Sequence, residues 1–349
     1  MRADSLFLMS TTHFPPVNVL FTSAGRRVEL LTMFRQAYKT LGLKGRVVAV
    51  DIDALAPTTQ VADRFYLVPR YNDPSYLPTL VDICRREEIH MVFPLIDPEI
   101  VLMAQNREVW ESTGAKLAVV SLDAARITQD KWLIYEFFKR IGVPVPQSWL
   151  PEHLPTADLS DFPLFIKPRV GSSSVNTFKV NNACELDFFK DHVPNPIIQE
   201  FLPGEEITHD VICDLDGAFL GVISRIRLQV RAGEILRGVT MFDAQMADYC
   251  RQIATALPAR GPITVQCVMK DGQAYFTEIN ARLGGGVPLS VAAGADFPVW
   301  LLARAAGMPY TIPALGHYKV PLYVTRFDDA FYLTEADREH IEAQRIRIE

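Results

Sequence analysis

The sequence predicts a mixed α/β and α+β fold, and three observations support that prediction. First, a buried strand over Val17–Thr22, a helix over Val28–Leu41 and a strand over Arg46–Val50 follow one another, the order that builds a parallel sheet. Second, an apolar strand over Ile263–Met269 runs into a Lys-Asp-Gly segment, which is a hairpin signal. Third, 349 residues with 49% hydrophobic content supply enough core for two or three domains.

The composition excludes several classes of protein. A net charge of −6 gives no electrostatic footprint for nucleic acid. The five cysteines are odd in number, scattered and without C-x-x-C spacing, so neither a disulfide framework nor a zinc site is predicted, and a cytoplasmic location is expected. No stretch approaches the roughly 20 apolar residues of a membrane span. The apolar run within residues 1–16 is too short for a signal peptide, and we expect this segment to be a loosely ordered leader.

The N-terminal strands and helices do not match a dinucleotide site. The G-x-G-x-x-G fingerprint is absent, since only Gly25 follows the first strand, and Asp51 alone is weak evidence for ribose binding. Strands over 64–68 and 91–94, a helix over 76–88 and another that ends near 110 continue the parallel pattern. Asp97 and Glu99 follow the 91–94 strand, where a proline-flanked helix cap is one interpretation.

The segment Tyr275–Gly286, YFTEINARLGGG, is predicted to be a strand that ends in a glycine-rich loop. Alternate residues of a strand share a face, so Glu278 and Asn280 point the same way, about 6.6 Å apart along the chain. A carboxylate and an amide oxygen can both hold Mg²⁺, which takes only one or two carboxylates from a protein. Arg282 follows where a cation could reach a transferring phosphoryl group. The alternative is a buried strand end with one satisfied carboxylate.

The hairpin turn decides whether Gln266 joins this face. A two-residue Asp-Gly turn would place Gln266 opposite Thr277, on the wrong face for Glu278. A three-residue loop places Gln266 opposite Phe276 instead. We therefore predict the three-residue loop, or another register of the same parity, which brings Gln266 to the face of Glu278 and Asn280.

Two lysines precede a loop of small residues. Lys131 begins an amphipathic helix predicted over 128–142 and, taken alone, is an ordinary solvated lysine. Lys167 lies among apolar residues of a strand predicted over 162–170, and a buried lysine needs an anion or a carbonyl as its partner. Backbone N–H groups and hydroxyls that can wrap phosphates come next, at Gly171, Ser172, Ser173 and Ser174.

Further charged residues alternate along two later strands. Glu206, Thr208 and Asp210 share one face, although a half-exposed strand position would also explain Asp210. Arginines then recur at 225, 227 and 231, with Arg237 after the next loop. Same-face arginines could neutralise phosphates or clamp a substrate carboxylate, and a solvated strand edge is the alternative.

The residues VQ…FTEINARLGGG resemble the metal-binding end of the ATP-grasp superfamily, particularly of members related to carbamoyl phosphate synthetase. The resemblance implies that Gln266, Glu278 and Asn280 hold Mg²⁺ between the ATP phosphates. It also implies that Arg282 helps to stabilise the acylphosphate-forming step. Arg237 falls in a segment next to the acceptor pocket, so Arg282, Arg237 and Asn280 are the expected catalytic residues.

The same resemblance implies the nucleotide contacts. Lys131 would contact a phosphate, Lys167 would lie near the adenine and the α-phosphate, and the 171–174 loop would cover the β- and γ-phosphates. Backbone groups of the hinge would read the adenine edge, at Glu200, Phe201 and Leu202. Glu206 is favoured over its neighbour for the ribose hydroxyls. Asp97 and Glu99 become candidates for binding the acceptor substrate.

The resemblance covers about residues 17–330 and implies an ATP-grasp fold with an N-terminal preATP-grasp, Rossmann-like lobe. After the leader at 1–16, we expect that lobe over 17–120 and a nucleotide-clamping small lobe over 121–200. The large lobe, with the metal and phosphate site, would span 201–330. A polar tail helix would occupy 331–349.

The implied activity is a ligation that consumes ATP with Mg²⁺ or Mn²⁺. A carboxylate would be activated as an acylphosphate and joined to an amine in an amide-type bond, with release of ADP and phosphate. The expected partners are small-molecule carboxylates and amines, and a homodimer is left open. Two alternatives remain: a bicarbonate-activating enzyme of the carbamoyl or carboxyphosphate type, and a non-catalytic ATP-binding sensor or partner subunit.

Overall fold

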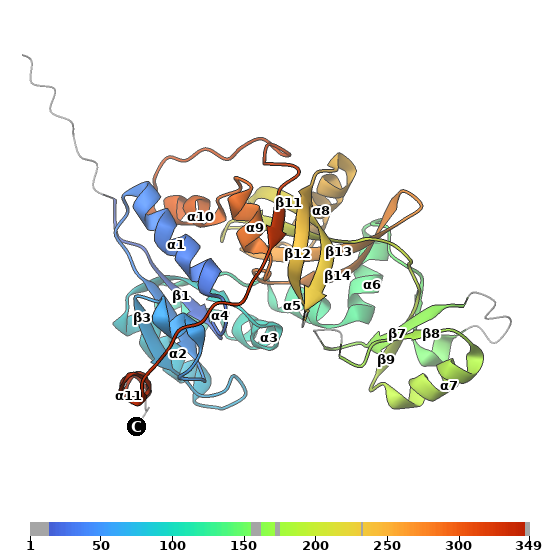
Figure 1. Ribbon diagram of the computed structural model, residues 1–349, viewed down its shortest axis with the longest axis horizontal. Helices are drawn as coiled ribbons and strands as arrows, with labels where there is room; N and C mark the ends of the chain where they lie inside the picture. The colour runs from blue at the N-terminus through green and yellow to red at the C-terminus, as the bar shows by residue number, and fades with distance from the viewer. Residues whose placement is uncertain (1–13, 155–161, 172–174, 232, 346–349) are drawn as a thin grey trace, which may run out of the picture.

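Three β-sheets organise the chain, which this computed structural model describes over residues 14–154, 162–171, 175–231 and 233–345. Figure 1 shows an N-terminal lobe, a large lobe in the centre and a small lobe at the far end. The predicted combination of a parallel and an antiparallel part is confirmed. Within the described ranges, no helix has the length and apolar character needed to cross a membrane.

The N-terminal lobe is built on a five-stranded parallel sheet in the order β3-β2-β1-β4-β5. Its strands are β1 (Asn18–Thr22), β2 (Val47–Asp51), β3 (Arg64–Leu67), β4 (Ile89–Pro94) and β5 (Lys116–Leu117). Its helices are α1 (Val28–Leu41), α2 (Tyr76–Arg86), α3 (Asp97–Gln105) and α4 (Arg107–Glu111), with a 3₁₀ turn at Pro57–Gln60. Every residue of β1 is buried, as its unbroken apolar run predicted.

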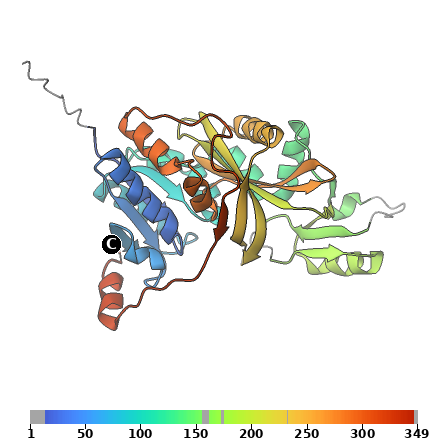
Figure 2. The same ribbon diagram turned by 45° about the horizontal axis from the view of Figure 1, so that its top comes forward.

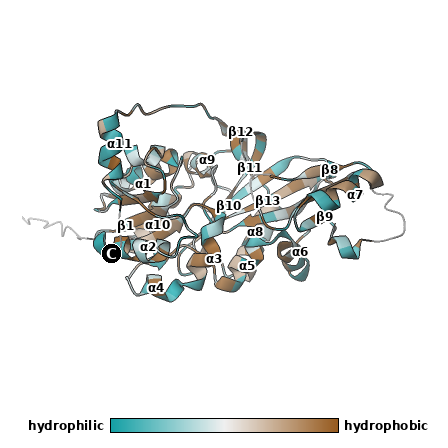
Figure 3. Ribbon diagram, turned by 90° about the horizontal axis from the view of Figure 1, so that it is seen from below, coloured by the Kyte–Doolittle hydropathy of each residue, from teal (hydrophilic) through white to brown (hydrophobic). Residues whose placement is uncertain are grey.

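The large lobe contains a six-stranded antiparallel sheet in the order β14-β13-β10-β11-β12-β15. The strands are β10 (Glu206–Cys213), β11 (Phe219–Arg231), β12 (Glu234–Met241), β13 (Pro262–Lys270), β14 (Gln273–Asn280) and β15 (Tyr323–Thr325). Its helices are α8 (Ala244–Ala256), α9 (Val287–Ala292) and α10 (Phe297–Ala306). Figure 3 shows the hydrophobic colouring of α10 and β1, which share a core, and the hydrophilic colouring of α4 at the outside.

The strand expected over 317–327 forms only at Tyr323–Thr325. Upstream of it, the backbone finds partners outside the sheet, since Lys319 N donates to Ala293 O at 2.8 Å. Pro321 has no N–H to contribute to a ladder. The prediction was therefore wrong for the first half of this segment.

The small lobe is a four-stranded sheet in the order β6-β9-β7-β8. It comprises β6 (Ser148–Trp149), a 3₁₀ turn at Pro151–His153, β7 (Leu164–Pro168), β8 (Phe178–Val180), α7 (Ala183–His192) and β9 (Pro196–Glu200). It has its own small core of six buried apolar residues. Figure 2 shows this lobe projecting away from the N-terminal lobe, on the other side of the central sheet.

Two helices precede the small lobe, α5 (Leu122–Gln129) and α6 (Lys131–Arg140). The single helix predicted over 128–142 is wrong, because Asp130 is extended and caps α6 through hydrogen bonds from the Trp132 and Leu133 amides. Both helices pack against β14, and their buried residues belong to the core shared by the N-terminal and large lobes. The sheet of the small lobe begins after these two helices, at β6.

A C-terminal strap, residues 322–345, connects the two larger lobes. It begins as β15 at the edge of the large-lobe sheet and ends in α11 (Glu335–Glu342), which lies beside β3 (Figure 1). Leu67 and Arg345 form a parallel bridge there, and Ile341 is buried in the N-terminal core. Residues 1–13 of the leader expected at 1–16, and residues 346–349 of the expected tail helix, lie outside the described residues.

Candidate active site

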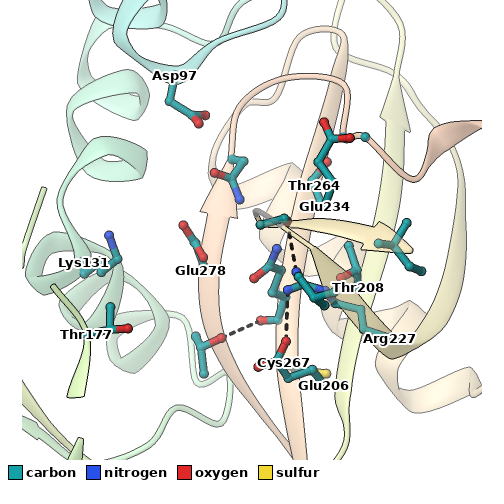
Figure 4. A pocket seen from close by; sticks show the side chains of 18 of the residues that line it. Asp97, Lys131, Thr177, Glu206, Thr208, Arg227, Glu234, Thr264, Cys267 and Glu278 are labelled. Carbon is teal, nitrogen blue, oxygen red and sulfur yellow. Dashed lines mark hydrogen bonds and ion pairs between the residues drawn. The ribbon is translucent and has the colours of Figure 1, made fainter. Parts of the chain in front are cut away.

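A cavity of about 730 Å³ lies where the three lobes meet. Figure 4 shows Asp97 and Glu234 at one end of it, Glu206 and Cys267 at the other, and Glu278 between them. Most residues predicted for the site line this cavity: Lys131, Lys167, Gly171, Glu200, Phe201, Leu202, Glu206, Gln266, Glu278, Asn280 and Arg282. The structure thus brings together segments more than a hundred residues apart in the chain.

The two lysines lie on the small-lobe side of the cavity. Lys131 Nζ donates to Gly171 O at 2.7 Å, which places this ammonium beside the small-residue loop. Lys167 is buried and donates to Gln199 Oε1 at 3.1 Å. Burial lowers the pKa of Lys167 to about 8, while the nearby Glu278 carboxylate opposes that shift. Among the described residues, the acceptor of this hydrogen bond is a neutral amide, and a buried cation paired in this way favours an anionic ligand.

An ion pair joins the N-terminus of α6, where Lys131 lies, to the residue that follows β7, the strand of Lys167. Arg169 donates from Nη2 and Nε to the Asp130 carboxylate at 2.6 to 3.1 Å, and the Lys131 amide donates to Arg169 O at 2.9 Å. Both side chains are largely buried. These contacts hold the α6 N-terminus and the end of β7 together. Ser172, Ser173 and Ser174 lie outside the described residues.

The face predicted to bind metal (the metal face), made of Gln266, Glu278 and Asn280, forms through a different strand register from the one predicted. Lys270 pairs with Gln273 across a two-residue turn at Asp271 and Gly272, both with positive φ, so the predicted three-residue loop is wrong. A β-bulge between Gln266 and Cys267 then shifts the register by one residue.

Gln266 consequently lies directly opposite Glu278, and Thr264 lies opposite Asn280. Gln266 therefore shares a face of the sheet with Glu278 and Asn280, as predicted, and the bulge is the reason that it does.

Gln266, Glu278 and Asn280 present one carboxylate and two amide oxygens to the cavity, a donor set that suits Mg²⁺ or Mn²⁺ when phosphate oxygens and water complete the shell. Within the described ranges, no three His, Cys, Asp or Glu side chains gather closely enough to hold a metal by themselves. Such a site would depend on the phosphates of a bound nucleotide.

The hinge and ribose candidates lie along the opposite rim. Glu200 is paired with Lys270 at 2.5 Å, which ties the end of β9 to the metal hairpin. Phe201 packs under the Lys179 ammonium, 4.5 Å from its ring centroid. Glu206 is more than half exposed and pairs with Arg227 at 3.0 Å.

Two ion pairs join the N-terminal lobe to the large lobe at the other end of the cavity. Asp97 Oδ2 lies 2.7 Å from Arg282 Nη2, and Arg27 Nη1 lies 3.2 Å from Glu234 Oε1. Burial lowers the pKa of Arg27, opposed by Glu234. Arg326 of the C-terminal strap also pairs with Glu234, at 3.0 Å.

The glycine loop after Arg282 packs directly on arginine side chains. A Cβ at Gly286 would lie 2.6 Å from Arg225 Nη2, and one at Gly285 would lie 2.6 Å from Arg27 Nη1. Arg225 is itself held by a buried ion pair with Asp210, whose other partner is Ser290 Oγ at 2.6 Å. Glycine is therefore required here for close approach.

Two predicted residues do not reach the cavity. Arg237 is exposed on β12, paired with Thr325 of β15 and away from the cavity lining. Glu99 is fully buried inside the N-terminal lobe and accepts hydrogen bonds from Thr22, Ser23 and Tyr76. Burial raises the pKa of Glu99, and these hydrogen bonds oppose the shift. Asp210 is also fully buried, so the half-exposed alternative is wrong.

Comparison with protein families assigns the domains. The model of the ATP-grasp domain matches residues 128–286, and the model of the PylC-like N-terminal domain matches residues 19–118. The chain contains an ATP-grasp domain preceded by a PylC-like N-terminal domain. The ATP-grasp match includes both lysines, the metal hairpin and Arg282, so the predicted family and fold are confirmed.

Curated ATP-grasp relatives are distant. The 3-methyl-D-ornithine–L-lysine ligase of Methanosarcina barkeri is 24% identical over 260 residues, which cover 74% of this chain and 66% of that protein. The carbamoyl phosphate synthase large chain of Clostridium beijerinckii is 24% identical over 327 residues, covering 83% of this chain and 29% of the relative. The chain thus spans less than a third of the large chain and about two thirds of the ligase.

Solved ATP-grasp structures share the fold. N5-carboxyaminoimidazole synthetase from Staphylococcus aureus, solved with ADP, has a TM-score of 0.65 at 16% identity, over 87% of this chain and 80% of that one. The L-amino acid ligase from Bacillus licheniformis has a TM-score of 0.62 at 17% identity, over 84% and 75%.

Sequence reasoning missed Arg27 and Glu234 as cavity residues of this ATP-grasp chain. Arg27 follows the carboxyl end of β1, and ligands of open parallel sheets bind outside the carboxyl ends of the strands. That rule could have selected Arg27. Glu234 lies in the same segment as Arg237, which the resemblance placed next to the acceptor pocket, but register irregularities between β11 and β12 hid which of the two faces the cavity.

Proposed function

We propose that the protein is an ATP-dependent ligase that activates a carboxylate as an acylphosphate and joins it to an amine, releasing ADP and phosphate. One observation carries this proposal: Lys131 and Lys167 lie across the same cavity from the Gln266, Glu278 and Asn280 donor set. Cations on one wall and metal ligands on the other suit a triphosphate with bound Mg²⁺ or Mn²⁺.

In this proposal Arg282 stabilises the charge of the transferring phosphoryl group, and positioning supplies most of the remaining rate acceleration. Glu206 is proposed for the ribose hydroxyls, and the hinge at 200–202 for the adenine edge. Names and activities of the ATP-grasp relatives support the reaction class.

The test is ADP release from purified protein with MgATP and separate pools of amino acids, hydroxy acids, uronic acids and bicarbonate. ADP and phosphate that depend on one carboxylate pool, and disappear in Glu278→Ala, would support the ligase. ADP that depends only on bicarbonate would favour the carboxyphosphate alternative. Formation of AMP and pyrophosphate would contradict the acylphosphate mechanism, and ATP binding without turnover would favour a sensor.

A further inference from the structure

Four charges of alternating sign close the cavity at the end where the N-terminal and large lobes meet. This charge quartet consists of Arg27, Glu234, Arg282 and Asp97. Its two ion pairs, at 3.2 and 2.7 Å, have opposite polarity across the lobe interface, with the cation on the N-terminal lobe in one and on the large lobe in the other. The four side chains are only 15 to 36% exposed.

The net charge of the quartet is zero, which limits the substrates that this end can accept. A ligand carrying only negative charge that took Arg282 would leave Asp97 without its cation in a partly desolvated site, and one that took Arg27 would leave Glu234 with Arg326 alone. Breaking one side of such a pair costs more than the pair itself contributes. A ligand with one negative and one positive group can replace each lost contact.

We propose that the charge quartet binds the carboxylate and the ammonium of an amino acid, which is the carboxylate donor of the reaction. This inference rests on the proposed ligase function. The carboxylate takes Arg282 and Arg27, and the ammonium takes Asp97 and Glu234. Arg282 follows Asn280 by two residues, so the bound carboxylate lies next to the metal face where a γ-phosphate would be transferred.

Glu234 is suited to this exchange because it has two cationic neighbours. Arg326 holds its second oxygen at 3.0 Å and is itself held by Glu29 at 2.9 Å. When an ammonium displaces Arg27, Glu234 therefore keeps its position. The exchange leaves no carboxylate of the quartet without a cation.

The first test measures binding alone, by calorimetry with Mg²⁺ and a non-hydrolysable ATP analogue. Each of the twenty amino acids would be compared with its N-acetyl derivative and its α-hydroxy analogue. We expect at least one amino acid to bind and both matched compounds, which lack the ammonium, to bind at least 100-fold more weakly. Equal binding of the hydroxy acid, or binding of no amino acid, would overturn the proposal.

Substitutions within the quartet test whether its own carboxylates, rather than neighbouring ion pairs, bind the amino acid. Glu234→Gln and Asp97→Asn should each weaken amino acid binding at least tenfold and leave the affinity for the nucleotide analogue unchanged. Asp216→Asn is the matched control, because the Asp216 pair with Lys116 also joins the N-terminal and large lobes but does not line the cavity. Amino acid affinity that is unchanged in both quartet variants would contradict the assignment.

A hydroxylamine trap distinguishes failure of this inference from failure of the ligase proposal. Its nitrogen attacks the acyl carbon and loses a proton, the bond from that carbon to the phosphate oxygen breaks, and a hydroxamate and phosphate result. Hydroxamate from free amino acids supports both proposals. Hydroxamate formed from N-acetyl or hydroxy acids, but not from amino acids, would contradict amino acid binding at the quartet and would still support the ligase proposal. Amino acid binding with neither ADP nor hydroxamate would overturn the ligase and the donor role with it.

Discussion

Asp130 and Arg169 bind each other through three hydrogen bonds of 2.6 to 3.1 Å, and Asp130 also caps α6. The pair therefore sets the position of Lys131 relative to the loop that starts at Gly171.

We expect Asp130→Asn to retain the cap, because asparagine is an equally good N-cap, and to lose the charged pair. The KM for ATP should rise about tenfold, since small displacements of positioning groups are costly. Steady-state kinetics would measure this, with Asp123→Asn, which breaks the exposed pair with Arg126, as the control. An unchanged KM would show that the loop is held by other contacts.

Glu278→Gln tests the metal face. The change keeps the shape of the side chain but removes the carboxylate that lies opposite Gln266. ADP release should fall about 10²- to 10³-fold, the usual loss when one stabilising contact to a transition state is removed. Glu205→Gln, an exposed acid nearby, is the control. Full activity at saturating Mg²⁺ would exclude Glu278 as a ligand.

The lowered pKa of Lys167 predicts that nucleotide binding depends on pH. Its pKa is lowered to about 8 by burial, so the free protein loses this cation as the pH rises above 8. Binding of ATP should then require proton uptake, and the apparent Kd should rise about tenfold per pH unit above that value. Calorimetry at pH 9 in buffers of different ionisation enthalpy would measure the uptake, which Lys167→Met should abolish.

The same shift has a consequence for the free energy of unfolding. Between about pH 8 and the unfolded-state pKa of 10.5, the unfolded chain binds more protons at Lys167 than the folded chain. The contribution of this lysine to stability therefore increases with pH across that window. Denaturant unfolding at pH 8 and pH 10, compared between wild type and Lys167→Met, isolates this contribution. A difference between the two proteins that does not vary with pH would contradict it.

Gly286→Ala tests the loop packed on Arg225. The added methyl group would lie 2.6 Å from Arg225 Nη2, and Arg225 cannot retreat easily because it is buried in its pair with Asp210. We expect a loss of about 1–3 kcal/mol in the free energy of unfolding. Gly221→Ala is the control, because its nearest neighbour would be 3.7 Å away. Equal stability of the two variants would contradict the packing argument.

Local patterns predicted the shared face of Glu278 and Asn280 and the buried Lys167, the family resemblance supplied Lys131, and long-range packing determined the rest. Strand alternation was enough to pair Glu278 with Asn280. The route by which Gln266 joins them was not predictable, because the bulge is set by the strand pairs on both sides of β13. Arg237 was misplaced for a related reason, since register shifts between β11 and β12 direct Glu234 to the cavity instead.

The distribution of hydrophobic cores determines which part of this molecule can move. The N-terminal and large lobes share two continuous clusters and are further joined by the C-terminal strap, whereas the small lobe has a core of its own. The low-energy motion is therefore rotation of the small lobe, with β7 and Lys167, against a rigid body that includes α6 and Lys131. Lys167 would travel with the moving part, while Lys131, the face formed by Gln266, Glu278 and Asn280, and the charge quartet stay fixed.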